Sequence, residues 1–448
     1  MRSSLPKMLH PVCGRAMVAW PVLAAREAGA GQVAAIVSPG IDISAGLPDG
    51  VETVVQPESD GTGGAVRAAL SLIEEAETVL VLSGDHPLIS AKNISDLLEI
   101  HARGGAAATL LTIELEDPGS YGRVVRNSSG EVERVVEAKE AGDADSEQLK
   151  IREINAGTYA FDAAPLAAAL AALSNGNAQG EYYLTDVFPA LREAGHAVAG
   201  HLTDDLAVTM GVNNRVELAE AEAIARSRVL EAHMLAGVTV VDPASTWVDA
   251  GVEIAADARL EPGTSLRGAT AVGPGSVVGP LTTLTDTVLG ACVQVPHSFL
   301  VECEVLDGCN VGPFAYLRPG AHLAREAKAG AFVEIKNSRI GEGATVPHLA
   351  YIGDAEVGAG SNLGAGTITA NYDGFRKHRT VIGAHTRIGV DTMLIAPVEV
   401  GDGAYTGAGA VIKEDVPEGA LAVSENDQRN IDGYAERKAA EMEEKEDS

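Results

Sequence analysis

The sequence predicts an α/β domain followed by an all-β domain built as a parallel β-helix. Strand-like and helix-like segments alternate over residues 1–215, which is typical of an α/β domain with a mostly parallel sheet. In the second part every sixth residue is aliphatic, with small and turn-forming residues between. A period of six fits neither an α-helix nor an alternating strand, and it favours a β-helix with a narrow aliphatic core. The first run comprises Val248, Ile254, Leu260, Leu266, Val272, Val278 and Leu284.

The strands expected in the first domain are short runs of β-branched and aliphatic residues. Ligands in parallel sheets bind beyond the carboxyl ends of such strands. Ser83, Gly84 and Asp85 follow one of these runs, so they are candidates for ligand binding. The expected strands lie at residues 32–38, 51–56, 78–82 and 107–115, and the expected helices between them at 64–75 and 91–102.

Residues 214–236 favour one long helix between the two domains, because they contain few helix breakers. The six-residue repeat then has two interruptions. The segment Asn371 to His378 is turn-forming, polar and basic. It has no aliphatic residue to place in the core, so it must project from the β-helix. We expect it to be a binding loop. Residues 286–309 have a blurred period and are expected to form an irregular coil, and the acidic tail from about residue 430 is expected to be a solvated helix.

Composition limits the classes of function. The 448 residues carry a net charge of −30, which disfavours nucleic-acid binding because phosphates would be repelled. The chain has no apolar run long enough to span a membrane and no signal peptide. Its cysteines lack paired C-x-x-C spacing, so we expect small buried residues in a reducing, cytoplasmic compartment: Cys13, Cys292, Cys303 and Cys309.

Three features of the first domain are suited to phosphate chemistry. Asp85 has the hard oxygen ligands that Mg²⁺ prefers, although an aspartate here also suits a helix N-cap. The turn Gly61-Thr62-Gly63-Gly64 precedes a helix, where backbone N–H groups can bind an anion, but a plain tight turn explains it equally well. Lys7 is either a phosphate contact or an ordinary surface lysine.

His348 is the candidate general base of the β-helix. It lies near Tyr351 in a domain where Arg318, Lys336 and Lys377 are among few basic residues, a set suited to a phosphorylated substrate. The alternative is a hydrogen-bonded structural histidine. A metal site of stacked histidines is disfavoured, because no multiple of one coil separates His297, His322, His348, His378 and His385.

A series of motifs runs along the chain. They are Leu5-Pro6-Lys7, Gly61-Thr62-Gly63, Gly84-Asp85, Tyr121-Gly122-Arg123, Asn177 to Tyr183, Gly211 to Arg215, Leu317 to Gly320, Gly364 to Thr367 and Asn371 to Gly374. Taken in this order, the motifs resemble the family of bacterial bifunctional N-acetylglucosamine-1-phosphate uridyltransferase / glucosamine-1-phosphate acetyltransferase, and the resemblance covers essentially the whole chain. It implies a Rossmann-like nucleotidyltransferase domain and a left-handed β-helix that trimerises so that subunits share each acetyltransferase site.

The family resemblance implies two reactions, acetyl transfer from acetyl-CoA to glucosamine-1-phosphate and then uridylyl transfer from UTP to the product. The products are UDP-N-acetylglucosamine and pyrophosphate. The implied domains are a uridylyltransferase at 1–213, a linker helix at 214–236, the acetyltransferase β-helix at 237–430 and an acidic helical tail at 431–448.

The resemblance also implies the site residues. In the uridylyl site, Asp85 and Asn213 would bind Mg²⁺, which offsets charge on the phosphates. Lys7 would meet phosphate. Gln56, Gly61 and Thr62 would hold the uracil with Ser83 nearby, and Gly122, Glu137 and Asn155 would hold the sugar.

In the acetyltransferase site, His348 would take the proton from the sugar amine, which then attacks the thioester. Arg318 and Lys336 would hold the sugar phosphate, and Tyr351 and Asn362 would surround the sugar. The acetyl-CoA groove would be lined by Ala365, Asn371, Tyr372, Val390 and Ala408, with Lys377 on the adjoining loop.

The chain departs from the family pattern at its start. Met1 aligns with the last residue of a Gly-rich L-A-A-G-x-G-T-R-M loop that cradles nucleotide phosphates, and without the strand before it two sheet edges would stay unpaired. Either the true start lies upstream, which the later motifs favour, or uridylyl transfer is defective. The alternatives are thus an acetyltransferase alone and a non-catalytic trimeric scaffold.

Three single-residue departures remain. Val390 and Glu425 replace a common serine and a common arginine at the coenzyme, so we expect weaker acetyl-CoA binding, unless Arg429 compensates. Asp60 replaces an apolar residue before Gly61.

Overall fold

The computed structural model describes residues 1–138, 144–175, 180–424 and 430–437. The chain forms two compact units. The first comprises Met1–Ala232 with Trp247–Gly251, and the second His233–Thr246 with Val252–Ser448. None of the helices in the described part of the chain combines the length and apolarity that a membrane span requires.

The first unit is an α/β domain whose main sheet is mixed. Over the described residues its strand order is β10-β6-β9-β7-β8, and β5 pairs with β9. Two further strand pairs lie outside this sheet, the antiparallel β1 and β2 and the parallel β3 and β4. The strands are β1 (Pro11–Val12), β2 (Arg15–Ala16), β3 (Ala34–Val37), β4 (Glu52–Val55), β5 (Thr78–Val81), β6 (Ala108–Glu114), β7 (Arg123–Arg126), β8 (Val132–Val136), β9 (Glu153–Asp162) and β10 (Val198–Leu202).

The expected strands are confirmed as β3, β4, β5 and β6, but the prediction of a mostly parallel sheet is wrong. The ten-residue β9 runs antiparallel to β5, β6 and β7, and the sequence patterns did not identify it as a strand. Among the described strands, β3 pairs with β4 alone and β5 with β9 alone. Each therefore keeps one open edge among the described strands.

Helices cover both faces of the sheet. Alternate residues of β9 point to opposite faces, so each set of residues packs against its own helices. Phe161 packs with Phe188 of α6 in one core, whereas Ala160 packs with Ile94 and Leu97 of α4 in another. The helices are α1 (Ala19–Glu27), α2 (Thr62–Ala68), α3 (Leu70–Glu74), α4 (Ala91–Gly104), α5 (Ala163–Ala172), α6 (Val187–Glu193) and α7 (Arg215–Leu235), which confirms the helices expected near 64–75, 91–102 and 214–236.

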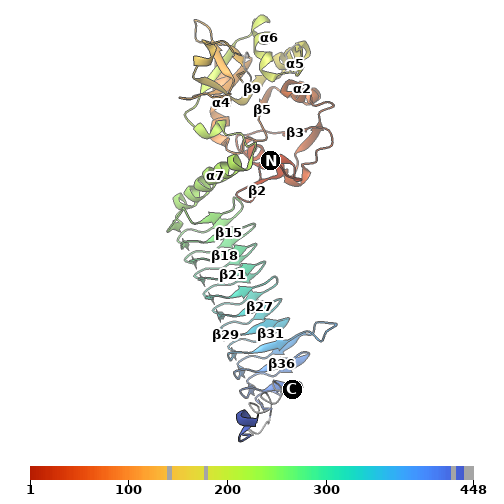
Figure 1. Cartoon of the computed structure of the whole chain (residues 1–448), viewed down its shortest axis with the longest axis vertical. Helices are drawn as coiled ribbons and strands as arrows, with labels where there is room; N and C mark the ends of the chain where they lie inside the picture. The colour runs from red at the N-terminus through yellow and green to blue at the C-terminus, as the bar shows by residue number, and fades with distance from the viewer. Residues whose placement is uncertain (139–143, 176–179, 425–429, 438–448) are drawn as a thin grey trace, which may run out of the picture. The chain divides into compact units, whose positions relative to one another are not determined.

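The second unit is a parallel β-helix of the kind the six-residue repeat predicts. Its short strands stack coil upon coil into three parallel sheets (Figure 1). Six of the seven aliphatic positions in the first run are buried and Ile254 is half-buried. The segment 286–309 is confirmed as an irregular turn of the β-helix. Its buried aliphatic residues Leu289, Val295, Leu300 and Val305 are spaced by six, five and five residues.

Three strands of one sheet carry or adjoin Arg318, Lys336 and Tyr351, namely β24 (Tyr316–Leu317), β27 (Glu334–Lys336) and β30 (Tyr351–Gly353). They pair in successive coils. The neighbouring sheet contributes β26 (Lys328–Ala331), β29 (Thr345–His348) and β32 (Asn362–Leu363), which also pair in order.

One loop projects from the stack of coils, as predicted (Figure 1). It lies between β33 (Ile368–Ala370) and β34 (Thr380–Ile382) and folds back through an antiparallel bridge between Tyr372 and Lys377. The Asp373 carboxylate closes its turn by accepting hydrogen bonds from the backbone N–H groups of Phe375 and Arg376. Those bonds and one from His378 lower the pKa of Asp373 to about 2.

The cysteine prediction is wrong for one residue. Cys13, Cys303 and Cys309 are buried, whereas Cys292 is exposed. Cys292 lies at a corner of the β-helix with φ of +56°, where the chain turns between strands and its side chain points away from the core. Residues 438–448 of the tail, with Glu425 and Arg429, lie outside the described residues.

Candidate active sites

Lys7 brings together the two residues expected to bind magnesium. Its ammonium donates to Asp85 Oδ2 at 2.7 Å and to Asn213 Oδ1 at 2.7 Å. Asp85 follows β5, and the backbone N–H of Asn213 donates to Glu217 Oε2 at 2.5 Å, which fixes the amide in place. The alternative of Asp85 as a helix N-cap is wrong, because Ser90 caps α4 and accepts from the Asn93 N–H.

These residues suit a magnesium ion. A carboxylate oxygen and an amide oxygen already contact one cation, the Lys7 ammonium, and both are hard donors. Within the described ranges, no three His, Cys, Asp or Glu side chains form a metal-binding group. Asp85 and Asn213 would supply two ligands at most, so a magnesium ion here would be held chiefly through substrate phosphates and water.

The turn at Gly61 is a packing feature. Gly61 has φ of +105°, and a Cβ there would lie 2.5 Å from the Tyr182 carbonyl oxygen. The Gly63 N–H donates to that same oxygen at 2.7 Å, and Thr62 Oγ1 accepts from the Leu184 N–H. The use of the Gly63 amide within the protein favours the tight turn over the anion site. The neighbouring motif residues Asn177, Ala178 and Gln179 lie outside the described residues.

Asp60 constrains the residue expected to hold uracil. The buried Gln56 side chain donates from Nε2 to Asp60 Oδ1 at 2.7 Å and to the Gly61 carbonyl at 3.2 Å. Arg67 forms an ion pair with the same carboxylate. Ser83 lies at the end of β5 and accepts from the His86 N–H through its carbonyl. Both contacts use the NH₂ group of Gln56, so a base would meet the amide oxygen, or meet the NH₂ group only after an exchange of partners.

The residues expected to hold the sugar lie at β7, β8 and β9. The Asn155 N–H donates to the Gly122 carbonyl at 2.9 Å, and its amide donates to the Tyr159 hydroxyl at 2.7 Å. Burial raises the pKa of Tyr159 to about 12, so this hydroxyl stays neutral. Thr185 donates to Glu137 Oε1 at 3.5 Å. A Cβ at Gly122 would lie 2.8 Å from Val135, so the glycine permits close packing.

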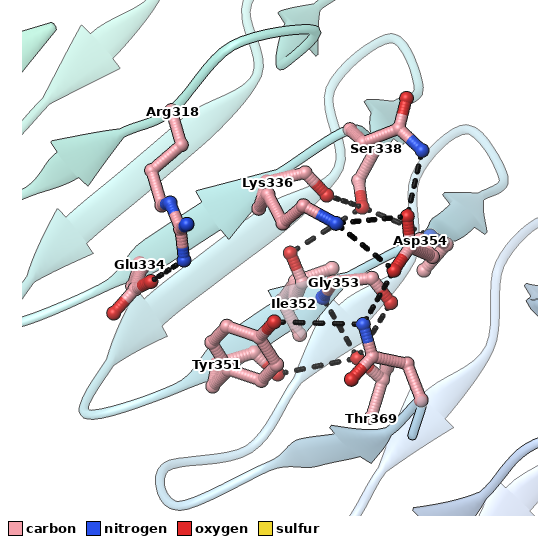
Figure 2. A network of polar contacts seen from close by, with 12 residues as sticks. Arg318, Glu334, Lys336, Ser338, Tyr351, Ile352, Gly353, Asp354 and Thr369 are labelled. Atoms are coloured by element: carbon pink, nitrogen blue, oxygen red, sulfur yellow. Dashed lines mark hydrogen bonds and ion pairs between the residues drawn. The ribbon is translucent and has the colours of Figure 1, made fainter. Parts of the chain in front are cut away.

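In the β-helix, basic residues gather on successive coils (Figure 2). Arg318, just after β24, donates to Glu334 Oε1 at 2.8 Å, and Lys336 pairs with Asp354 at 3.2 Å. Lys377 of the projecting loop lies against Lys336. Their contact raises the pKa of Lys336 and lowers that of Lys377, with Asp354 favouring the charged Lys336. Such a cluster of cations is suited to a phosphate group.

Asp354 links several of the predicted residues, and the sequence patterns did not single it out. Its carboxylate accepts from Asn371 Nδ2 at 2.5 Å and from Asn337 Nδ2 at 2.6 Å. It also pairs with Lys336 (Figure 2). The Asn371 amide also lies 3.5 Å from the Tyr351 hydroxyl. The network therefore contacts a predicted sugar-phosphate residue, a predicted sugar residue and a predicted coenzyme residue at once.

His348 ends β29 and is exposed, so its ring is accessible to a substrate. It pairs in register with Ala331 of the preceding coil. Asn362 lies on the next coil, where its amide oxygen accepts from Thr345 Oγ1 at 2.8 Å.

The predicted coenzyme residues fall into two groups. Ala365, Val390 and Ala408 each follow a strand of one sheet by two residues, in consecutive coils, after β32, β35 (Arg387–Ile388) and β38 (Tyr405–Thr406). Val390 is 48% exposed. Asn371 and Tyr372 stand instead at the base of the projecting loop, where Asn371 is buried and Tyr372 exposed.

Comparisons with known proteins agree with both units. A nucleotidyl transferase family model matches residues 3–253, and a bacterial transferase hexapeptide model of six repeats matches residues 379–414. Proteins named bifunctional protein GlmU match 98% of this chain. The chain is 46% identical to that of Corynebacterium efficiens, covering 91% of it, and 47% identical to those of Streptomyces avermitilis and Mycobacterium tuberculosis H37Ra, covering 92% and 90%.

Similarity over nearly the whole chain, together with both domain matches, confirms the predicted bifunctional transferase and the predicted fold class, a Rossmann-like nucleotidyltransferase domain followed by a left-handed parallel β-helix. The chain therefore belongs to the family of bifunctional GlmU proteins, with one nucleotidyl transferase domain and one hexapeptide transferase domain.

Proposed function

We propose that the β-helix transfers the acetyl group of acetyl-CoA to the amine of glucosamine-1-phosphate, with His348 as general base. The observation that carries this proposal is the gathering of Arg318 and Lys336, on successive coils, with Lys377 of the projecting loop, so that like charges repel. A phosphate dianion offsets such repulsion between like charges. Glucosamine-1-phosphate carries this dianion on the same small ring as its amine.

In the reaction, His348 takes a proton from the amine, whose nitrogen then attacks the thioester carbonyl carbon. The C–N bond forms, the C–S bond breaks, and coenzyme A leaves as a thiolate that takes up a proton. Arg318 and Lys336 hold the phosphate, while Tyr351 and Asn362 surround the sugar. Ala365, Asn371, Tyr372, Val390 and Ala408 line the coenzyme groove. Holding both substrates in line supplies much of the rate.

We further propose that the first unit transfers a uridylyl group from UTP to N-acetylglucosamine-1-phosphate. The sugar phosphate oxygen attacks the α-phosphorus and pyrophosphate leaves, so the protein needs no nucleophile of its own. Asp85 and Asn213 would hold Mg²⁺, which neutralises phosphate charge when bound. Lys7 neutralises further charge, Gln56 and Thr62 contact the uracil, and Gly122, Glu137 and Asn155 hold the sugar.

The test compares His348→Ala with His385→Ala, another exposed histidine of the β-helix. We expect acetyl transfer to fall at least 100-fold in the first variant, which is the usual contribution of general base catalysis, and to stay unchanged in the second. Unchanged activity in His348→Ala would remove the assignment of the base. Acetyl transfer by the parent chain would itself dismiss a non-catalytic scaffold.

One observation favours acetyl transfer alone as a second candidate function. Asp60 engages the Gln56 amide at 2.7 Å, and in this family resemblance that amide would hold the uracil. Pyrophosphate release from UTP and N-acetylglucosamine-1-phosphate decides between the two candidates. Clear turnover by the 448-residue chain dismisses the second one.

We also propose that the chain forms a homotrimer through one corner of the β-helix, the apolar ridge formed by Leu281, His297, Phe314, Phe332 and Leu349. All five residues have positive φ, a conformation that costs bulky residues roughly 1–2 kcal/mol. Four of them are more than half exposed, and the rings of Phe314 and Phe332 stack at 5.3 Å.

The chemistry of the other corners supports this choice. They turn mostly at Gly, Asp, Asn and Glu, residues that suit positive φ or water, as at Asp286, Glu326 and Asn337. Exposed apolar residues with a strained backbone are unfavourable in a single subunit. Another copy of the chain that covers them removes their apolar surface from water. Leu349 directly follows His348, so a covered ridge would place each base beside a neighbouring subunit.

A further inference from the structure

We propose that Asp354 is a positioning residue that holds Lys336 and Asn371 in the geometry needed for acetyl transfer, so that one carboxylate sets the binding of both substrates. The inference rests on the proposed function of the β-helix. It adds a residue that the motifs do not assign.

The position of Asp354 is fixed by its surroundings. It directly follows β30 with φ of +51°, and its side chain is 12% exposed. Its backbone N–H donates to the Lys336 carbonyl of the preceding coil, and its own carbonyl accepts from the Thr380 N–H of the following one. The carboxylate therefore stands at a fixed point between consecutive coils.

Three side chains share that carboxylate. Oδ1 accepts from Asn337 at 2.6 Å, Oδ2 accepts from Asn371 at 2.5 Å, and Lys336 lies 3.2–3.3 Å from both oxygens. Burial opposes ionisation, but hydrogen bonds from Asn337, Lys336 and Asn371 outweigh it and lower the pKa of Asp354. The group is thus an anion that accepts and never donates.

Gly353 shows that this arrangement needs space. A Cβ at Gly353 would lie 2.5 Å from the Tyr351 hydroxyl and 2.7 Å from Asn371 Nδ2. The absent side chain lets Tyr351 and Asn371 approach each other above the strand. Asn371 is 7% exposed, so its amide has little freedom to find another partner.

Lys336 depends on the same carboxylate for a different reason. Lys377 lies against it, and two adjacent ammonium groups repel each other. Asp354 compensates this repulsion through its ion pair with Lys336 at 3.2 Å. Without it, Lys336 would turn away from Lys377 or lose its charge, and either change weakens phosphate binding.

The test is the steady-state kinetics of Asp354→Asn in the full chain. An amide keeps the size and suits the positive φ, but its NH₂ faces the donors of Asn371 or Asn337. We expect KM for glucosamine-1-phosphate and KM for acetyl-CoA each to rise about tenfold, the size of one charge-assisted hydrogen bond, with a smaller change in kcat.

The matched control is Asp286→Asn. Asp286 directly follows β18 (Thr283–Thr285) of the same sheet, has φ of +48°, and its carboxylate accepts from the Ala269 N–H without touching a predicted site residue. We expect both KM values of this control to match those of the parent chain. Equal kinetics of the two variants would overturn the proposal.

Coupling between residues separates positioning from general loosening. In an Asn371→Ala background, Asp354→Asn should raise KM for acetyl-CoA no further but still raise KM for glucosamine-1-phosphate. In a Lys336→Ala background the pattern should reverse. Fully additive effects, or a lower kcat with both KM values unchanged, would overturn the proposal.

Asn337→Gly is the second variant, should Asp354→Asn fail to fold. It removes one bond to Asp354 and suits the φ of +44° at that position. Both KM values should rise in the same direction by a smaller factor, and unchanged values would count against the proposal. A parent chain without acetyl transfer would refute the proposed function, whereas an active parent with a normal Asp354→Asn variant would refute only this inference.

Discussion

Replacing Phe332 by asparagine should dissociate the proposed trimer without harming the fold of the subunit. Phe332 is 59% exposed at φ of +58°. Burying a whole Phe side chain stabilises by about 1.5–3 kcal/mol, so covering this fraction contributes about 1–2 kcal/mol per subunit. Three copies contribute about 3–5 kcal/mol, which corresponds to roughly 10²–10⁴ in the trimerisation constant.

The subunit itself should be unharmed, because asparagine tolerates positive φ better than phenylalanine. The assay is light scattering behind size-exclusion chromatography over a range of protein concentrations. Circular dichroism monitors the fold. Dissociation should also lower acetyl transfer, since the base is expected beside a neighbouring subunit.

Glu326→Asn is the matched control. Glu326 has the same φ of +58° and is exposed, but it precedes β26 whereas Phe332 follows it, so it lies at another corner. It should leave the trimer intact. The reasoning would be refuted if Phe332→Asn associated as tightly as the parent chain. It would also be refuted if Phe332→Asn and Glu326→Asn dissociated equally.

Three further predictions concern the separate sites. His348→Ala should lower kcat for acetyl transfer at least 100-fold and leave pyrophosphate release from UTP and N-acetylglucosamine-1-phosphate unchanged, as coupled assays can measure. Asp85→Asn should do the reverse and raise the Mg²⁺ concentration needed for half-maximal uridylyl transfer; an unaltered magnesium response would argue against the metal assignment. In the folded protein one thiol, Cys292, should react rapidly with a disulfide reagent, because burial raises the pKa of Cys13 to about 12 and of Cys303 and Cys309 to about 11. Fast reaction of a second thiol would contradict the burial pattern.

The sequence predicted the β-helix well because its six-residue repeat corresponds directly to the repeating strands of the structure. Every sixth residue is aliphatic and faces a narrow core, so the burial of Leu260 and Leu284 could be predicted from the sequence alone. The loop at Asn371 was predictable for the opposite reason, since polar residues cannot stay in that core.

The first unit was harder to predict. The sequence of β9 does not give the direction of the strand, because its antiparallel pairing depends on partners far away in sequence. Asp60 was recognised as unusual, but its bond to Gln56 depends on the conformation of the turn between them.

Motifs carried the predicted site residues, whereas the residues that contact and support them were not predicted. Lys7, Asp85 and Asn213 come from three distant motifs and meet within hydrogen-bonding distance. Asp354 stands in an ordinary corner position of the β-helix, and nothing in its local sequence separates it from Asp286. Only the packing of consecutive coils brings it to Lys336 and Asn371.

The central claim is that one chain carries two independent transferase sites, and complementation tests it most directly. His348→Ala and Asp85→Asn are each supplied with glucosamine-1-phosphate, acetyl-CoA, UTP and Mg²⁺, singly and mixed, and UDP-N-acetylglucosamine is measured. Each variant alone should form little product, and the mixture should form it readily, because Asp85→Asn supplies the acetylated sugar that His348→Ala consumes. UDP-N-acetylglucosamine formed by His348→Ala alone would contradict this claim. A lack of this product from both the mixture and the parent chain would contradict it as well.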